Sequence, residues 1–385
     1  MPVRKMKTDV VIIGGGINGC SLAYQLSKKG IDVALFERKY ICSGATGRCG
    51  AGIRQQWSTR ENIILAKESV KIFSKLSREL KEDIGFRQGG YLVAIHDEKE
   101  LKEAEERVKL QRSLGVDVKI IDKDEIKEIV PILDPDGMHA IGATFCPTDG
   151  HADPFKTTFA YARRAVENGA KIFTHREVNK IIVEKNKVKG VVADGERIIC
   201  DYVINSAGAW SRIVARMAGI DIPNRPLRKE AIVTEKVKRV FDAMVISFRD
   251  GIYFSQQSEG NILGGIPGPD EREGYLYQPT FSFLNHMART LTRYAPVLKF
   301  VRVLRHWTGF YDVSPDARPI IGEDPNIKGF IHCHGFSGHG FMLSPMVTKI
   351  ISDYISDGKD SDYLHSLSIE RFKGKDISRE VSVVG

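Results

Sequence analysis

The sequence predicts an α/β protein in which a parallel-sheet domain is assembled from separated segments and a second, α+β domain is built on a mixed sheet. A complete β-turn-α-β unit spans residues 9–37, residues 228–320 are rich in short strands, and the last 60 residues return to a strand, a glycine-rich turn and a helix. The 385 residues exceed the roughly 100–200 of a typical domain. We expect the first domain over residues 1–85, 146–222 and 322–385, and the second over 86–145 and 223–321.

The first unit begins with residues 9–13, a short β-branched run that is typical of a buried parallel strand. A glycine-rich turn occupies residues 14–19, and the helical stretch that follows it ends near Gly30. Residues 31–36 form the next strand, which leads into Glu37. In this strand-turn-helix-strand context the G-x-G-x-x-G spacing is a specific indication of a dinucleotide site.

The later elements follow from periodicity and turn residues. Apolar side chains at helical spacing predict a helix over residues 61–82, and a charged surface helix is expected over residues 98–114. From residue 178 to residue 204, apolar and polar side chains alternate around two turn sequences, which predicts a β-meander that ends in a buried strand. A final helix is expected over residues 342–355. No internal repeat or low-complexity linker interrupts the pattern.

Composition excludes several classes of protein. No stretch reaches 18 apolar residues, so no transmembrane anchor is expected, and the basic N-terminus lacks the apolar core of a secretory signal. The net charge of +8 contains no block of five like charges, which argues against DNA as a partner. The six cysteines form no C-x-x-C pair, so we expect reduced thiols in the cytoplasm.

The glycine-rich turn has the spacing that a dinucleotide needs. Gly14 permits the tight turn, Gly16 lets main-chain amides approach a pyrophosphate, and Gly19 lets the helix pack on the sheet. The phosphates then lie at the helix N-terminus, where unpaired N–H groups favour an anion. Glu37 can accept both ribose hydroxyls and disfavours a 2′-phosphate, so FAD or NAD is expected. The small-residue loop at 42–48 favours FAD, because an NAD-dependent dehydrogenase does not need it.

Four motifs in a fixed order resemble the D-amino-acid-oxidase superfamily of FAD enzymes, most closely sarcosine oxidase β subunits, glycine oxidases and the β subunits of dye-linked L-proline dehydrogenases. The resemblance spans residues 8 to about 360, and three further segments favour the β-subunit variant. The motifs are residues 14–19 with Glu37, 43–48 (SGATGR), 205–210 (NSAGAW) and 335–341 (GFSGHGF), and the further segments are 52–57, 307–309 and 314–322.

The resemblance implies an FAD-binding, Rossmann-type domain of the glutathione-reductase kind, with a substrate domain over the flavin face. The first glycines and Glu37 would hold the ADP half, and the turn before the last helix would close on the isoalloxazine ring, where its amides stabilise negative charge. The implied cofactor residues are Gly14, Gly16, Gly19, Glu37, Arg38, Ser43, Ala45, Thr46, Arg48, Cys49, Val178, Ala207, Gly208, Gly338, His339, Gly340, Phe341 and Met342.

Three residues are candidates for the substrate side. An amine must be neutral to be oxidised, and a nearby cation lowers its pKa, while a substrate carboxylate favours a bidentate guanidinium. The resemblance makes Arg54 this anchor, the alternative being an arginine paired with a carboxylate of the protein. It places Tyr253 over the flavin, with a core aromatic as an equal alternative. His339 is the third candidate, and Cys49 lies near the flavin or only fills space.

Three histidines near the C-terminus, His332, His334 and His339, raise the question of a metal site. They lack nearby Asp or Glu ligands in a helical or open-site arrangement. We therefore expect no metal, and we assign these histidines to the turn and to contacts with the flavin.

The sequence also departs from its relatives. Monomeric sarcosine oxidases carry a flavin-bonded cysteine where this chain has Gly309, so FAD is expected to be noncovalent. They carry a carboxylate-binding lysine where this chain has Met342. A lysine associated with oxygen activation aligns with Ile262, which argues against an efficient oxidase. Electrons are then expected to pass to a dye, a quinone, or a flavin or iron–sulfur centre of a partner.

The hypothesis is an FAD-dependent enzyme that oxidises the C–N bond of a small amino acid (L-proline, sarcosine or glycine) by hydride transfer to flavin N5, giving an imine. We expect it to be the catalytic β subunit of a heteromeric dehydrogenase whose companion subunits carry a further redox centre, in the cytoplasm or peripheral to the membrane through its acceptor. Three alternatives stay open: a stand-alone oxidase that forms hydrogen peroxide, an FAD domain acting on tRNA-attached aminomethyl groups, and a non-catalytic flavin relay.

Overall fold

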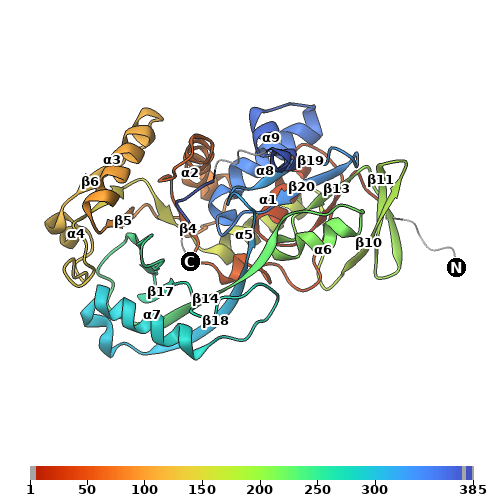
Figure 1. Ribbon diagram of the computed structural model, residues 1–385. Helices are drawn as coiled ribbons and strands as arrows, with labels where there is room; N and C mark the ends of the chain where they lie inside the picture. The colour runs from red at the N-terminus through yellow and green to blue at the C-terminus, as the bar shows by residue number, and fades with distance from the viewer. Residues whose placement is uncertain (1–5, 375–378, 384–385) are drawn as a thin grey trace.

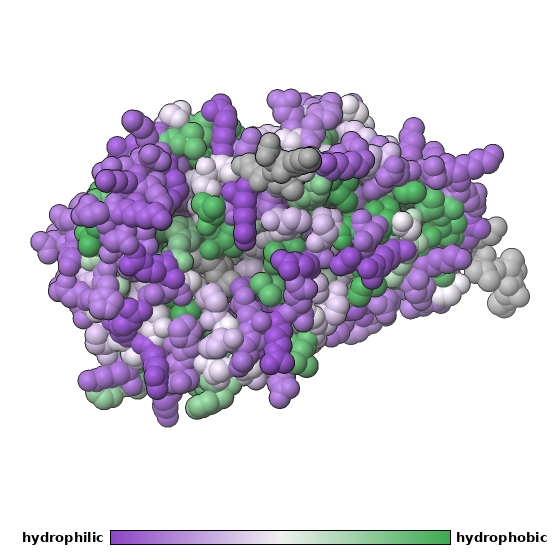
Figure 2. All heavy atoms as spheres, viewed as in Figure 1, coloured by the Kyte–Doolittle hydropathy of each residue, from purple (hydrophilic) through white to green (hydrophobic). Residues whose placement is uncertain are grey.

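The computed structural model describes residues 6–374 and 379–383. It confirms the α/β class: a six-stranded, mostly parallel sheet and an eight-stranded mixed sheet lie toward opposite ends of an elongated molecule (Figure 1). Hydrophilic residues cover most of the face drawn in Figure 2. Within the described residues, no helix has the length and apolar character needed to cross a bilayer.

The six-stranded sheet has the strand order β19-β20-β13-β2-β3-β9. Its strands run parallel except β19, which joins the edge antiparallel to β20. The central strands are covered on both faces, which is why their sequences are continuous apolar runs. The strands are β2 (Val10–Ile13), β3 (Val33–Phe36), β9 (Lys171–Phe173), β13 (Tyr202–Asn205), β19 (Ile320–Glu323) and β20 (Phe330–His334).

Most helices of this half pack on one face of the sheet, while the other face packs against α6 and the segment 178–200. The first helix, α1, packs against α5 and α8, and α2 packs against α8. Because α1 is enclosed in this way, its apolar residues do not form a single stripe, and nine of its residues are buried. The helices are α1 (Ile17–Ser27), α2 (Arg60–Leu80), α5 (Pro154–Glu167), α6 (Ser211–Arg216), α8 (Gly340–Asp357) and α9 (Asp362–Ser366), with the 3-10 turns η1 (Thr46–Arg48), η2 (Gly208–Trp210) and η4 (Ile369–Lys373).

The predicted β-meander is confirmed. Its first turn is Lys185-Asn186, and its second is Asp194-Gly195. All four residues have positive φ, which matches the twist of a two-residue hairpin. The meander belongs to a sheet of order β1-β12-β11-β10 that shares a core with the six-stranded sheet. Its strands are β1 (Met6–Lys7), β10 (Val178–Glu184), β11 (Lys187–Ala193) and β12 (Glu196–Ile199).

The eight-stranded sheet has the order β18-β14-β17-β16-β15-β5-β7-β6 and a hydrophobic core of its own. Its strands are β5 (Tyr91–Ile95), β6 (Lys119–Ile121), β7 (Gly142–Cys146), β14 (Arg225–Lys236), β15 (Met244–Ile246), β16 (Tyr253–Gln256), β17 (Asn261–Gly265) and β18 (Val303–Val313). The accompanying helices are α3 (Glu98–Ser113), α4 (Lys123–Ile129), α7 (Phe281–Tyr294) and the 3-10 turn η3 (Pro296–Phe300). Two short strands, β4 (Gly52–Ile53) and β8 (Gly150–His151), pair separately.

Candidate active site

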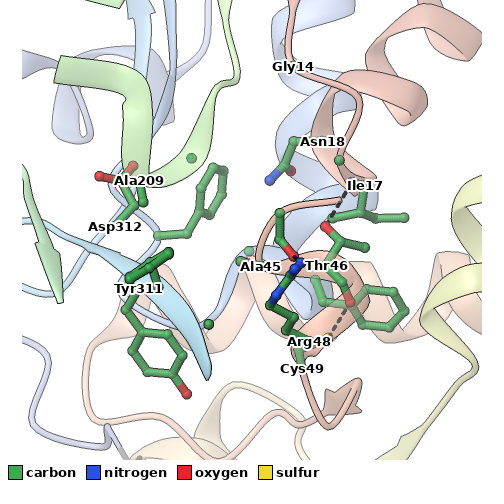
Figure 3. Close-up of a pocket in the computed structure, with 18 of the residues that line it drawn as sticks. Gly14, Ile17, Asn18, Ala45, Thr46, Arg48, Cys49, Ala209, Tyr311 and Asp312 are labelled. Carbon is green, nitrogen blue, oxygen red and sulfur yellow. Dashed lines mark hydrogen bonds between the residues drawn. The ribbon is translucent and has the colours of Figure 1, made fainter. Parts of the chain in front are cut away.

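One elongated cavity runs from the N-terminus of α1 to residues of the eight-stranded sheet. Figure 3 shows Asn18, Ala45 and Arg48 facing Tyr311 and Asp312 across it. All the residues that the sequence predicted to bind the cofactor or to act on the substrate line this cavity, with the exception of one glycine. The fold therefore brings together segments that are more than 300 residues apart in the chain.

The exception is Gly19, which lies beneath the turn. A Cβ atom on Gly19 would lie 1.9 Å from the carbonyl oxygen of Gly14. Gly19 therefore lets α1 approach the turn closely, the packing role that the sequence motif assigns to the third glycine.

Glu37 lies at the nucleotide end of the cavity, just after β3. One carboxylate oxygen accepts a hydrogen bond from the amide of Gly15 at 2.8 Å. The other accepts from the amide of Lys39 at 2.8 Å and from the hydroxyl of Ser43 at 3.0 Å. These bonds fix the carboxylate at the edge of the sheet, beside the turn that precedes α1.

The turn before α1 leaves polar groups that protein atoms do not satisfy. The hydroxyl of Thr46 accepts from the amide of Ile17 at 3.1 Å, so η1 lies over the start of the helix. A Cβ atom on Gly16 would lie 3.1 Å from the same hydroxyl. Within the described part of the chain, the buried side-chain oxygen of Asn18 has no hydrogen-bond partner. A ligand that carries a hydrogen-bond donor would satisfy this oxygen, whereas the free amides of the helix N-terminus favour an anion.

Arg48 stabilises the loop between Glu37 and β4 by hydrogen bonds to the main chain of that same loop. Its guanidinium donates to the carbonyl oxygens of Ser43 and Gly44, and it lies 5.1 Å from the ring centroid of Tyr277. The indole N–H of Trp307, on β18, donates to the carbonyl of Arg48 at 3.1 Å. The loop is thus tied to the eight-stranded sheet across the middle of the cavity.

Arg54 lies at the other end of the cavity, directly after β4, and only 2% of it is exposed. Its guanidinium donates to the carbonyl oxygens of Gln56 (2.6 Å) and Ser382 and lies 3.7 Å from the ring centroid of Trp57. No carboxylate in the described part of the chain lies within ion-pair distance of it. The alternative of an arginine paired with a protein carboxylate therefore finds no support among these contacts.

A buried aspartate holds the segment that carries Arg54. Asp149 accepts hydrogen bonds from the amide of Gln55 at 2.8 Å and from the side-chain amides of Gln55 (2.9 Å) and Gln56 (3.2 Å). Burial raises the pKa of Asp149 to about 6, although these hydrogen bonds oppose that effect. These hydrogen bonds hold the segment after β4 against Asp149, and the amide of Trp57 donates to the carbonyl of Gln55 at 3.0 Å, so the main chain turns tightly there.

Three tyrosines line the cavity near Arg54: Tyr91, Tyr253 and Tyr311. Burial raises the pKa of all three hydroxyls, so each keeps its proton and can donate a hydrogen bond. Tyr91 lies against the main chain of residue 52, which must be a glycine, since a Cβ atom there would lie 1.6 Å from the hydroxyl oxygen of Tyr91.

Sequence reasoning found Tyr253 but missed Tyr91 and Tyr311. A signal for Tyr311 existed, because side chains two residues apart on a strand share a face and Gly309 had already been aligned with a flavin-contacting position. Tyr91 starts an apolar run on β5, and its sequence gives no sign that it borders a cavity.

His339 immediately precedes α8 and packs edge-on against Trp57, with ring centroids 4.3 Å apart. Burial, helped by the charge of Arg54, lowers the pKa of His339 to about 3. Its Nδ1 atom is buried and has no partner among the described residues. The imidazole is therefore neutral at ordinary pH and does not act there as a cationic acid.

His332 and His334 do not line the cavity but lie in a buried polar chain behind it. His332 contacts Asp324 at 3.1 Å and His334 at 2.8 Å. His334 in turn contacts Asn224 at 3.0 Å, and Asn224 donates to Asp312 at 2.9 Å. The expectation that these two histidines contact the flavin is wrong, because β20 directs them into the interior, where acidic and amide groups satisfy them.

Asp312 should make the protein less stable as pH rises from about 5 to 7. Burial raises the pKa of its carboxyl from 3.8 to about 7, although hydrogen bonds from Gly335 and Asn224 oppose this. In this window the folded state keeps a proton that the unfolded state has lost, so stability falls with rising pH and levels off above 7. Between pH 5 and 8, the free energy of unfolding in urea should fall by about 2–3 kcal/mol more in the wild type than in Asp312→Asn. If the free energy of unfolding has the same pH dependence in the wild type and in Asp312→Asn, this prediction is wrong.

Comparison with known proteins gives one family and several relatives. A family model described as "FAD dependent oxidoreductase" matches residues 9–354. The chain is 29% identical over 377 residues to sarcosine oxidase subunit beta of Arthrobacter sp, covering 97% of this chain and 93% of that protein. It is 28% identical over 384 residues to the mitochondrial sarcosine dehydrogenase of Homo sapiens, covering 94% of this chain and 41% of that protein.

Solved structures share the fold over nearly the whole chain. L-proline dehydrogenase from P. horikoshii has a TM-score of 0.91 at 38% identity, with coverage of 96% of this chain and 98% of that one. Glycine oxidase from Bacillus cereus ATCC 14579 has a TM-score of 0.83 at 27% identity, with coverage of 94% and 98%. The likeness therefore extends over both sheets and is not confined to the nucleotide-binding half.

The residues present fit FAD. The helix N-terminus at Gly16 and the carboxylate of Glu37 suit an ADP moiety. At the far end, Gly338 has a φ of +96°, and a Cβ atom there would lie 2.5 Å from Tyr311. Only glycine lets this turn adopt its shape beside the tyrosine, and the turn leads into the N-terminus of α8, whose free amides favour negative charge.

Proposed function

The chain belongs to the family of FAD-dependent oxidoreductases, and on that premise we propose that it oxidises the C–N bond of a small amino acid to an imine. L-proline, sarcosine and glycine are the substrate candidates. The observation that carries this proposal is Arg54, a buried guanidinium at the cavity wall that has no acidic partner among the described residues. A buried charge is costly without an opposite charge, and the carboxylate of an amino acid would supply one.

The residues around Arg54 suit this reaction. FAD, when bound, would supply the two-electron acceptor for the hydride that leaves a carbon bonded to the substrate's amine nitrogen. Arg54 would bind the carboxylate through the N–H groups that Gln56 and Ser382 do not use. Its charge would lower the pKa of the substrate's ammonium group, which then loses its proton to solvent. The amine lone pair forms the C=N bond as the hydride leaves, and water hydrolyses the imine.

The tyrosine hydroxyls would complete the carboxylate site. Tyr91 and Tyr253 keep their protons because burial raises their pKa, so they are donors toward an anion. Their rings, together with Trp57, exclude water from Arg54, and each charge-assisted hydrogen bond is stronger where water is excluded.

We further propose that FAD is held noncovalently and that the chain works with a companion subunit that carries a further redox centre. Gly309 has no side chain that could bond to the flavin, and a Cβ atom there would lie 3.2 Å from Arg48. The name of the Arthrobacter relative, a β subunit, supports a heteromeric assembly. Release of all the yellow chromophore by acid would support noncovalent binding, and chromophore left on the denatured chain would exclude it.

A stand-alone oxidase that forms hydrogen peroxide is the second candidate. The likeness to glycine oxidase from Bacillus cereus favours it. The two candidates differ only in the electron acceptor, so oxygen consumption by the purified chain distinguishes them.

An anaerobic titration tests the proposed function. L-proline, sarcosine, glycine and D-alanine are added separately to the holoprotein while flavin absorbance is recorded. We expect one of the first three to bleach the flavin, because only a substrate positioned at Arg54 transfers a hydride. Rapid recovery of colour on admission of air would indicate the oxidase, and recovery only with an added dye would indicate the dehydrogenase. Holoprotein that none of these amino acids bleaches would contradict the proposal.

A further inference from the structure

The C-terminal residues 379–383, here named the C-terminal strap, run extended beside the segment that carries Arg54. In Figure 1 the dark blue end of the chain returns toward β4. Exposure alternates along the strap: Glu380 (1%) and Ser382 (3%) point inward, whereas Val381 is 63% exposed. Such alternation is what a strand-like segment shows when one side is packed against the protein.

Glu380 docks the strap at the start of α2. Its carboxylate accepts hydrogen bonds from the amides of Ser58 and Thr59, both at 3.1 Å, and from the side chains of Thr59 (2.9 Å) and Asn62 (3.2 Å). Burial would raise the pKa of Glu380, but its hydrogen bonds lower it, led by the one that the hydroxyl of Ser58 donates. The carboxylate is thus an anion near a helix N-terminus, where the helix dipole favours it.

Glu380 binds the main chain immediately before α2 and not the first amides of the helix itself. Thr59 is the N-cap residue of α2, and its own side chain makes no capping bond. The hydroxyl of Thr59 instead donates to Glu380, so the N-cap residue is held by a group more than 300 residues away in the chain. A carboxylate with this many donors has little freedom to move, so the main chain of the strap is fixed on both sides of it.

Ser382, two residues after Glu380, connects the fixed strap to Arg54. Its carbonyl oxygen accepts a hydrogen bond from the guanidinium of Arg54, while the carbonyl of Gln56 accepts a second. The plane of the guanidinium is set by these two carbonyls and by the ring of Trp57. Because carbonyls are neutral, they orient the guanidinium without cancelling its charge. Glu380 contributes only at a distance, by favouring the charged form of Arg54.

The strap does not fill the substrate's place. Val381 and Ser382 line a second cavity, of about 270 Å³, together with Gln56 and Phe248. Neither Val381 nor Ser382 lines the first cavity, which the predicted cofactor residues line, whereas Arg54 does. The strap therefore contacts the guanidinium from behind, which leaves the side toward the three tyrosines open to a ligand.

We propose that Glu380 and Ser382 are positioning residues, through which the C-terminal strap orients Arg54 toward the carboxylate of the substrate. This inference rests on the proposed function, because it takes Arg54 as the carboxylate anchor. A long arginine side chain loses rotamer freedom when it binds a ligand, and fixing it beforehand reduces that cost. The anchor of this site would then be assembled from two distant parts of the chain.

Binding of acetate to the holoprotein, followed through the flavin absorbance, tests this inference. Two variants remove the docking contact: Glu380→Gln, and a chain that lacks residues 379–385. The matched control is Glu370→Gln, since Glu370 is exposed and pairs with Lys373 at 3.0 Å. We expect the dissociation constant of acetate to rise at least about tenfold in both strap variants and to stay at the wild-type value in the control, with FAD content unchanged in all three.

A second readout separates positioning from a general structural role. Pyrrolidine has an amine but no carboxylate, so its rate of flavin reduction should be the same in wild type and Glu380→Gln, while that of L-proline falls. Equal losses for both amines, acetate binding at wild-type strength in Glu380→Gln, or tighter binding in the shortened chain would each overturn the inference.

The acetate titration also separates failure of this inference from failure of the proposed function. If acetate binding is weakened by Arg54→Ala but not by the strap variants, only the strap inference fails. If the wild type shows no acetate binding that depends on Arg54, and no amino acid bleaches its flavin, the proposed function fails and the strap inference fails with it.

Discussion

Replacing Arg54 with alanine is expected to lower kcat/KM for the amino acid substrate by about 2–4 kcal/mol, or about 30- to 700-fold. The substrate carboxylate would lose a charge-assisted, bidentate partner in a site from which water is excluded. The tyrosine hydroxyls would remain as donors, but they carry no charge to lower the pKa of the amine. Steady-state kinetics with the amino acid that bleaches the flavin would measure the change.

A matched control exists on the next helix. Arg60 is exposed at the start of α2, so Arg60→Ala should leave kcat/KM at the wild-type value. Arg54→Lys should recover only part of the loss, because an ammonium keeps the charge without the planar fork. Unchanged kinetics in Arg54→Ala, with full FAD content, would remove the anchor role and with it the main support for an amino-acid substrate.

Replacing Gly19 with alanine is expected to abolish retention of FAD, with the FAD content of the purified chain falling below about a tenth of the wild-type value. The added Cβ atom would lie 1.9 Å from the carbonyl oxygen of Gly14. That oxygen belongs to the main chain, so it cannot turn aside as a side chain would, and either the turn or α1 must move. The movement would displace the amides that are expected to hold the pyrophosphate.

The comparison for this variant is Gly268→Ala. A Cβ atom there would meet Phe283 at 3.7 Å, an ordinary contact distance, and Gly268 does not line the cofactor cavity. Its FAD content and its thermal unfolding temperature should stay near those of the wild type. Gly19→Ala protein with a full complement of FAD and an unshifted unfolding temperature would show that the turn is not required in the observed shape.

The nucleotide-binding half was predictable because its signals are local. A strand, a glycine-rich turn, a helix and a second strand follow one another within residues 9–37, and each is encoded by its own composition and spacing. The helices predicted over 61–82 and 98–114 are observed as α2 (Arg60–Leu80) and α3 (Glu98–Ser113). Both are surface-packed helices, whose periodicity survives because only one face is buried.

The substrate end was less predictable because its parts are not neighbours in sequence. Arg54 was found through a resemblance, but its environment comes from β4, β5, β16, β18 and the C-terminal strap. The local sequences around Tyr91 and Tyr311 are those of ordinary strands and do not distinguish these tyrosines from core residues. For His332 and His334 the sequence predicted too much. Their place beside the glycine-rich turn suggested contacts with the flavin, but both are buried behind the cavity.

The sequence by itself therefore determined the fold class and the family resemblance, and it identified the residues expected to hold a dinucleotide, because glycines and a carboxylate at this spacing in a β-turn-α-β unit are typical of such a site. Only the tertiary structure decided which groups surround Arg54, that no carboxylate among the described residues pairs with it, and that Ser382 contacts it. Long-range pairing of strands and docking of the chain end bring these groups together, and the cavity they form depends on relative positions in space that no local sequence pattern encodes.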